Sequence, residues 1–210
     1  MSLTTPDRRT ALRLLLCLIV TAFGSAPAAM ASEITAPVEQ LHSGLTEVMK
    51  AGRAAPFRQR YDRLAPVIGR TFDLQAILRQ VIGLRWNSLP PDQQAALEDA
   101  FRRYTIASYV ANFDATGERF EILPGVSAVG NDRVVQTRLV GPSGQAHVLA
   151  YVMRQSGNGW RIVDVLADGS ISRVAAQRSE VRSVLADGGS AALVVSLRRK
   201  TAELSGDILQ

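Results

Sequence analysis

The chain has 210 residues, of which 47% are hydrophobic and 20% charged, and it contains one cysteine and two histidines. This composition is that of a globular protein and excludes disordered, collagen-like and coiled-coil chains. The formal charge of +5 would suit a nucleic-acid partner, but much of it lies in the N-terminal segment.

The first 31 residues have the pattern of a secretory signal peptide. A basic stretch with Arg8, Arg9 and Arg13 precedes an apolar run over 14–23, and the run Ala29-Met30-Ala31 has the small residues of a cleavage site. We expect cleavage after Ala31 and export from the cytoplasm, by either the Sec or the twin-arginine route. The apolar run is shorter than the roughly 20 residues that span a bilayer, so no transmembrane helix is predicted.

Removal of this segment changes the chemistry that the chain can perform. The single cysteine, Cys17, lies within it, so the mature chain is expected to lack disulfides, thiol nucleophiles and cysteine-bound metals. The loss of three arginines and one aspartate lowers the formal charge to +3. The remaining arginines are scattered and no aromatic residues alternate with them, so nucleic acid is not an expected partner.

Apolar residues recur at helical spacing from Pro37 to about position 113. The pattern predicts four helices, which begin at or near Pro37, Phe57, Asp73 and Pro91. Gly83 is the expected end of the third helix, and Pro66 should bend or end the second. The fourth helix is apolar on opposite sides, which predicts that it is enclosed on both.

From Phe120 the apolar period changes to two residues, and this period predicts four strands over 120–129, 133–140, 145–154 and 160–167. Turns rich in glycine separate them, so we expect an antiparallel meander. The third strand is apolar on both faces and should be covered on both. A closing helix pair with a break at Gly188-Gly189 follows. The predicted fold is α+β, with a twisted four-stranded sheet wrapped by N- and C-terminal helices in a single domain over 32–205 and a tail over 206–210.

Few residues carry catalytic chemistry. His42, in a polar helical stretch, and His147, in a strand, have no partner at metal-ligand spacing, and no phosphate loop or nucleophile elbow is found. We therefore expect neither a metal nor a cofactor. The best remaining group is Asp164 with Tyr151 and His147. We interpret Asp164 as a structural carboxylate bonded to a backbone amide or an arginine, and the alternative is the base of a small hydrolase or isomerase with Tyr151 as donor.

An ordered set of residues resembles the MlaC family of periplasmic phospholipid-binding proteins. The set consists of Phe72-Asp73-Leu74, Ile77, Gly83, Trp86, Gln93, Phe101, Tyr109, Tyr151, the run Trp160-Arg161-Ile162-Val163-Asp164-Val165, and Gly169-Ser170-Ile171. The runs over 107–113 and 168–173 are similar to the hopanoid-associated branch, HpnM. The resemblance implies that the sheet encloses an apolar cavity and is related in shape to cystatin-like and NTF2-like sheets.

The resemblance also implies a monomeric periplasmic carrier and not an enzyme. Such a carrier moves phospholipid or hopanoid between an inner-membrane lipid transporter of the MCE or RND type and an outer-membrane complex. Each exposed methylene costs about 0.8 kcal/mol, so a lipid tail of about 16 carbons costs on the order of 13 kcal/mol to expose to water. The other alternative is a lipid-free adaptor with a filled core.

Candidate lining residues follow from strand and helix periodicity. Ala146 and Ala150 are small residues on an otherwise bulky sheet and would leave room for a ligand. The candidate lipid-binding residues are Tyr104, Tyr109, Val135, Leu139, Leu149, Ala150, Tyr151, Val163 and Val165. Because periodicity reports burial alone, ordinary core packing is the alternative for each of them.

Overall fold

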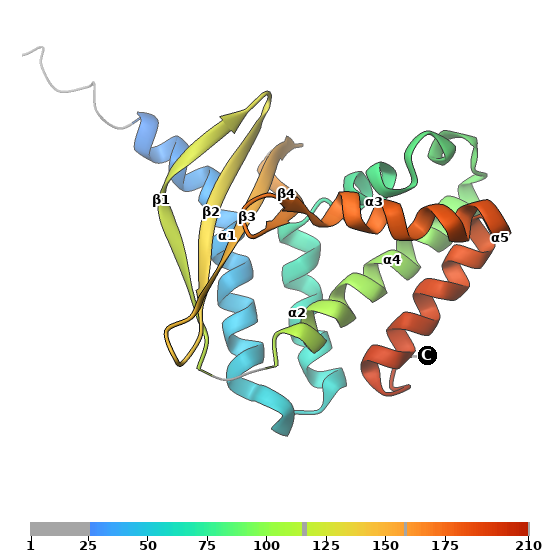
Figure 1. Ribbon diagram of the computed structural model, residues 1–210, viewed down its shortest axis with the longest axis horizontal. Coiled ribbons are helices and arrows are strands. Elements are labelled where there is room, and N and C mark those ends of the chain that lie inside the picture. Colours follow the sequence, from blue (N-terminus) through green and yellow to red (C-terminus); the bar gives the residue numbers. More distant parts are fainter. Residues whose placement is uncertain (1–25, 115–116, 158, 210) are drawn as a thin grey trace, which may run out of the picture.

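The computed structural model describes residues 26–114, 117–157 and 159–209. The basic and apolar parts of the expected signal peptide and Cys17 lie outside these residues. The helices that it describes are α1 (Ala26–Ala51), η1 (Gly52–Ala54), α2 (Phe57–Thr71), α3 (Leu74–Ile82), η2 (Gly83–Ser88), α4 (Pro91–Asn112) and α5 (Arg173–Ser205) (Figure 1). The strands are β1 (Arg119–Val129), β2 (Asp132–Val140), β3 (Ala146–Ser156), β4 (Gly159–Ala167) and β5 (Ile171–Ser172).

The strands form one antiparallel sheet in the order β1-β2-β3-β4-β5. The predicted meander is confirmed, and the four predicted strands agree with β1 to β4 within two residues at each end. The count of four was wrong, because Ile171 and Ser172 pair with the end of β4 as a fifth strand. Two residues are too few to show a period of two. The comparison with cystatin-like and NTF2-like sheets does not describe this five-strand meander.

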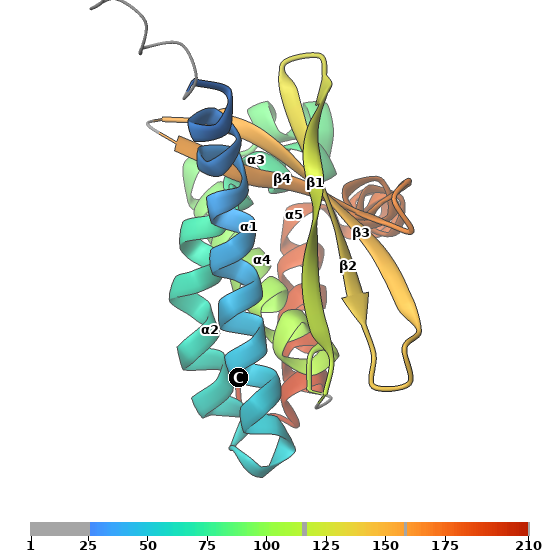
Figure 2. The same cartoon turned by 90° about the vertical axis from the view of Figure 1, so that its left-hand side faces the viewer.

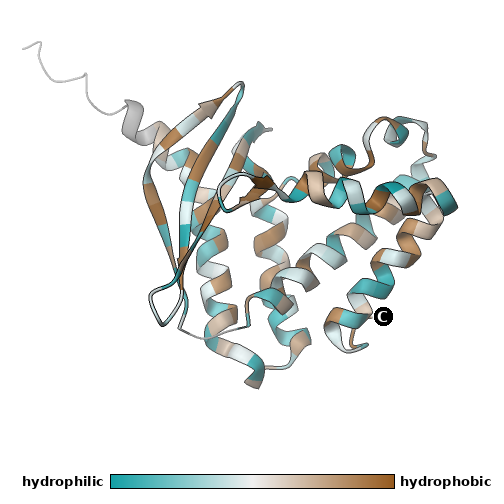
Figure 3. Cartoon of the chain, in the orientation of Figure 1, coloured by the Kyte–Doolittle hydropathy of each residue, from teal (hydrophilic) through white to brown (hydrophobic). Residues whose placement is uncertain are grey.

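The helices pack against one face of the twisted sheet (Figures 1 and 2). Apolar and polar residues alternate along β1 and β2 (Figure 3), and the main core takes Val135 and Tyr151 from the helix-facing side. On the other side Gln136 and Arg138 are exposed. On the outer side of β3, Ala150 is buried and Val148 and Val152 are half-buried, whereas Ala146 and Arg154 are exposed, so the expectation that both faces of this strand are covered holds only for its middle. Ala150, on the outer face, is 1% exposed because its small side chain lies between larger neighbours on β2 and β4.

The capping residues of α3 were predicted correctly. The Asp73 carboxylate accepts a hydrogen bond of 2.9 Å from the amide of Ala76 at the start of the helix. At the other end Gly83 has φ 71°, a conformation that suits glycine, and it stops the helix.

The expectation that Pro37 opens the first helix was wrong, and Pro66 does not end the second. Helix α1 begins at Ala26, so the expected cleavage point after Ala31 lies within it and Pro37 is internal instead of first. The carbonyl group that Pro37 leaves without an amide partner belongs to Glu33, which is exposed and accessible to water. Helix α2 likewise continues through Pro66 to its end, since the completely buried Ile68 holds the following turn in place.

The predicted break in the last helix is confirmed. Gly189 has φ 65° and ψ −159°, outside the helical range, and divides α5 into two segments. The second segment folds back against α4, with Leu193 and Leu197 buried (Figure 1). Helix α4 is thereby enclosed by α2, α3 and α5, as its two apolar sides predicted.

Strand β1 forms an edge of the sheet and is interrupted. Its pairing with β2 shifts register between Ile122 and Val126, where Pro124 and Gly125 stand. Gly125 has φ 89°, which favours glycine. Among the helices that the structure describes, none has both the length and the apolar character needed to cross a bilayer.

Candidate binding cavity

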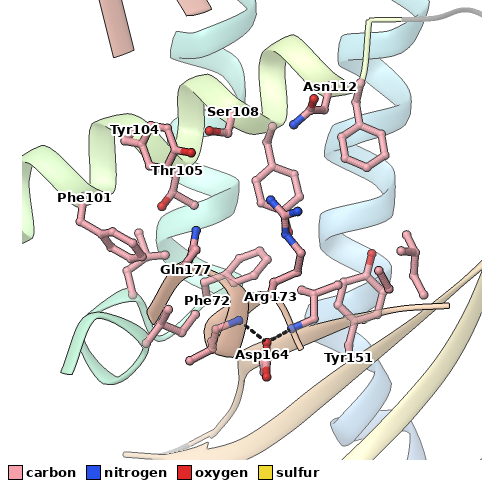
Figure 4. Close-up of a pocket in the computed structure, with 18 residues that line it drawn as sticks. Phe72, Phe101, Tyr104, Thr105, Ser108, Asn112, Tyr151, Asp164, Arg173 and Gln177 are labelled. Carbon is pink, nitrogen blue, oxygen red and sulfur yellow. Dashed lines mark hydrogen bonds between the residues drawn. The ribbon is translucent and has the colours of Figure 1, made fainter. Parts of the chain in front are cut away.

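A cavity of about 350 Å³ lies between the helices and the sheet. It is bounded by α3, α4, the first turns of α5, the middle of β3 and the end of β4 (Figure 4). Its apolar and aromatic walls come from Phe72, Leu74, Ile77, Phe101, Tyr104, Tyr109, Phe113, Leu149, Tyr151, Val165, Ala167 and Val174. Its polar lining comes from Thr105, Ser108, Asn112, Asp164, Arg173 and Gln177.

Aromatic rings on α4 build one wall of the cavity. The ring of Tyr109 lies 5.5 Å from that of Phe72 and 5.8 Å from that of Phe113, centroid to centroid. Burial raises the pKa of the Tyr109 hydroxyl, which therefore stays protonated at neutral pH. This wall is largely apolar.

The sheet side of the cavity is held in place by a buried polar pair. The hydroxyl of Tyr151 on β3 is hydrogen-bonded to Nε2 of His42 on α1 over 3.2 Å. The His42 ring stacks on Phe120, with centroids 4.2 Å apart and an angle of 13° between the planes. Burial lowers the pKa of His42 to about 4, so the imidazole is neutral at pH 7.

His42 faces the interior of the molecule. Its sequence neighbours are polar, but position 42 faces the sheet beside Leu41 and Leu45, and the residue is 7% exposed. Along the sequence, neither His42 nor His147 has a partner at metal-ligand spacing. In the part of the chain that the structure describes, no group of three His, Cys, Asp or Glu residues could hold a metal ion.

Asp164 is hydrogen-bonded at the start of α5. Its Oδ1 accepts from the amides of Val165, over 2.7 Å, and Val174, over 3.1 Å, and its Oδ2 accepts from the Ser172 hydroxyl. The interpretation of Asp164 as a carboxylate bonded to backbone amides is thus confirmed. As a general base it would have to give up these bonds, and among the described residues no hydrogen bond joins it to Tyr151. The arrangement supports a structural role.

The nine residues predicted from periodicity fall into two groups. Five line the cavity, and these are Tyr104, Tyr109, Leu149, Tyr151 and Val165. The other four do not: Val135 is packed in the core beside Tyr151, Leu139 is half-buried near the end of β2, and Ala150 and Val163 lie outside the main core.

Most of the helical side of the cavity was not predicted from the sequence. Phe101, Thr105, Ser108 and Asn112 line it from α4, and Arg173 and Gln177 line it from α5. On α4 these residues recur three or four positions apart, so they share a face. This face carries hydroxyl and amide groups at helical spacing, although the helix is otherwise enclosed by apolar contacts. That pattern in the sequence could have identified the face.

The helices and the sheet form an α+β domain with a largely apolar cavity between them. The family model described as MlaC protein matches residues 39–199, and the chain therefore belongs to the MlaC family. Its fold is similar to that of a phospholipid-binding protein from Ralstonia solanacearum, whose structure was solved in complex with a phospholipid. The TM-score is 0.71 and the sequence identity 21%, over 82% of this chain and 99% of that chain. No curated protein sequence matches the chain. The family expectation is confirmed, and the hopanoid-associated branch stays a prediction.

Proposed function

We propose that the protein is a periplasmic lipid carrier. It takes phospholipid or hopanoid from one membrane and delivers it to the other, between an inner-membrane lipid transporter of the MCE or RND type and an outer-membrane complex. The observation that carries this proposal is the cavity of about 350 Å³ at the centre of an MlaC-family domain.

The size and lining of the cavity support an apolar ligand. Pockets for small ligands span about 300 to 1,000 Å³ and are lined mainly by apolar and aromatic side chains with a few polar groups. Buried Phe72, Phe101 and Tyr151 supply such walls here. Because each methylene moved out of water contributes about 0.8 kcal/mol, an acyl or polycyclic tail would occupy this space in preference to water.

The hydrogen bonds that Asp164 and Tyr151 make within the fold support a carrier over a hydrolase or isomerase. The carboxylate of Asp164 caps α5, and the hydroxyl of Tyr151 is bonded to a buried, neutral imidazole. Both groups are engaged in hydrogen bonds within the fold. A filled core, as a lipid-free adaptor would have, does not fit the cavity.

The expected signal peptide and the family of the chain support a periplasmic location. The phospholipid complex of the Ralstonia solanacearum protein supports phospholipid as one cargo. The resemblance to the hopanoid-associated branch supports the other.

Lipid extraction tests the proposal. Protein purified without detergent is extracted with organic solvent, and the extract is analysed by mass spectrometry, which also separates phospholipid from hopanoid. We expect bound lipid in the extract from the wild type. An extract free of lipid would overturn the carrier function.

A cavity-filling variant locates the bound lipid. Ala167→Trp places an indole in the cavity, and Ala128→Trp places one on the exposed surface of β1. We expect Ala167→Trp to lose most of the bound lipid while Ala128→Trp keeps it, with both proteins folded by circular dichroism. Equal lipid content in the two variants would place the lipid outside this cavity.

A further inference from the structure

The opening of the cavity can be located from the exposure of its lining. Among the described residues that line it, Asn112 at the end of α4 and Arg173 at the start of α5 are exposed, and the rest are half-buried or buried. The mouth therefore lies between these two helix ends. A lipid with its tail in the cavity would place its head group beside Arg173.

Arg173 brings a positive charge to this mouth. Figure 4 shows its side chain extending from α5 into the cavity, on the side of Ser108 and Asn112. Burial raises the pKa of Tyr109, and the charge of Arg173 acts in the opposite direction, as expected for a guanidinium close to that ring. Within the part of the chain that the structure describes, no hydrogen bond or ion pair engages the guanidinium. The nearby acid in the cavity, Asp164, is already bonded to two amides and a hydroxyl.

A polar strip continues inward from the mouth. The hydroxyl oxygens of Thr105 and Ser108 are buried and have no hydrogen-bond partner among the described residues. Both face the cavity from α4, and Gln177 faces it from α5. Buried polar groups are normally hydrogen-bonded, so two unpaired hydroxyls beside an empty volume indicate a ligand that carries oxygen atoms near its head.

From these observations we infer that Arg173 binds the phosphate of a lipid head group at the mouth of the cavity, with the Asn112 amide as a second donor. The inference rests on the proposed carrier function and makes it more specific. A guanidinium is the side chain best suited to phosphate, because its parallel N–H groups can donate to two phosphate oxygens. A polycyclic hydrocarbon without an anionic group would leave Arg173 unpaired, so the site favours a phospholipid over a neutral hopanoid.

The test compares two lipids with identical acyl chains, phosphatidylglycerol and diacylglycerol, on delipidated full-length protein. Dissociation constants are measured by displacement of a fluorescent fatty acid. We expect the wild type to prefer phosphatidylglycerol by roughly ten- to hundredfold, the range for a hydrogen bond to a charged group. Arg173→Gln should remove this preference and leave diacylglycerol binding unchanged, and Arg173→Lys should retain part of it.

Arg182→Gln is the matched control, since Arg182 is exposed on the same helix and does not line the cavity. An unchanged preference in Arg173→Gln, or an equal loss of both lipids from a variant that melts like the wild type, overturns the inference. Displacement of phosphatidylglycerol by inorganic phosphate that is equal in the wild type and in Arg173→Gln also overturns it, because the phosphate would then act at a site other than Arg173. If the wild type binds neither lipid, the carrier function itself fails.

Discussion

Acidification should destabilise the protein through His42. The imidazole is buried against Phe120 and Tyr151, and burial lowers its pKa from 6.5 to about 4. In the unfolded chain the same imidazole is in water and binds a proton below pH 6.5. Between these two values the unfolded state binds more protons than the folded state, so the free energy of unfolding falls as the pH falls.

The size of this loss follows from the shift in the pKa of His42. One pKa unit corresponds to about 1.4 kcal/mol, and the linkage relation then predicts a loss of about 2 kcal/mol at pH 5 and about 3 kcal/mol at pH 4, relative to pH 7.5. Such a loss is a large fraction of the about 5–15 kcal/mol that stabilises a typical domain.

The double variant His42→Phe/Tyr151→Phe isolates this contribution. It keeps the stacking on Phe120 and removes both members of the polar pair, so its stability at pH 7.5 should be close to that of the wild type. Denaturant unfolding at pH 7.5 and pH 5 should show that the wild type loses about 2 kcal/mol more than the double variant. His147→Gln, at an exposed histidine, should keep the pH dependence of the wild type. A parallel loss in wild type and double variant would refute the reasoning.

Two further predictions concern α5, each measured by denaturant unfolding. Asp164→Ala should lower stability by about 1–3 kcal/mol because it removes the hydrogen bonds from the Val174 amide and the Ser172 hydroxyl at the start of the helix. Asp187→Ala, at an exposed position on the same helix, should change stability by less than about 0.5 kcal/mol. Equal effects would contradict the capping role. Gly189→Ala should lower stability by about 1–3 kcal/mol because φ 65° with ψ −159° is essentially restricted to glycine. Gly69→Ala, in α2 with open space around the added methyl, should raise stability by about 0.4–1 kcal/mol. A loss of stability at Gly69 would show that backbone conformation is not what distinguishes it from Gly189.

The sequence was sufficient to predict those helices and hairpins whose ends are determined by capping or turn residues. The start of α3 at Asp73 and its end at Gly83 follow from a side-chain cap and a left-handed glycine, and the hairpins follow from their turn residues. The start of α1 did not follow, because whether a helix continues through Pro37 depends on packing against the rest of the molecule. The strand at 171–172 did not follow either, since it exists only through its pairing with β4.

The cavity could be predicted on its sheet side and, on α4, only at Tyr104 and Tyr109. Tyr151 and Val165 are cross-strand partners on the helix-facing side, and strand alternation placed both correctly in the interior. The helical side depends on the rotation of α4 about its axis and on the direction in which α5 leaves the sheet. Both are tertiary properties, and Arg173 in particular has no feature in the sequence that distinguishes it from the other arginines.

The interruption of β1 also affects how molecules of this protein meet one another. An unbroken edge strand of eleven residues would offer a second molecule a long row of free amide and carbonyl groups. Pro124 has no amide hydrogen, and the shift beside it turns the neighbouring groups out of line, so only short lengths remain available for pairing. The broken edge therefore protects the protein from edge-to-edge aggregation in a crowded compartment.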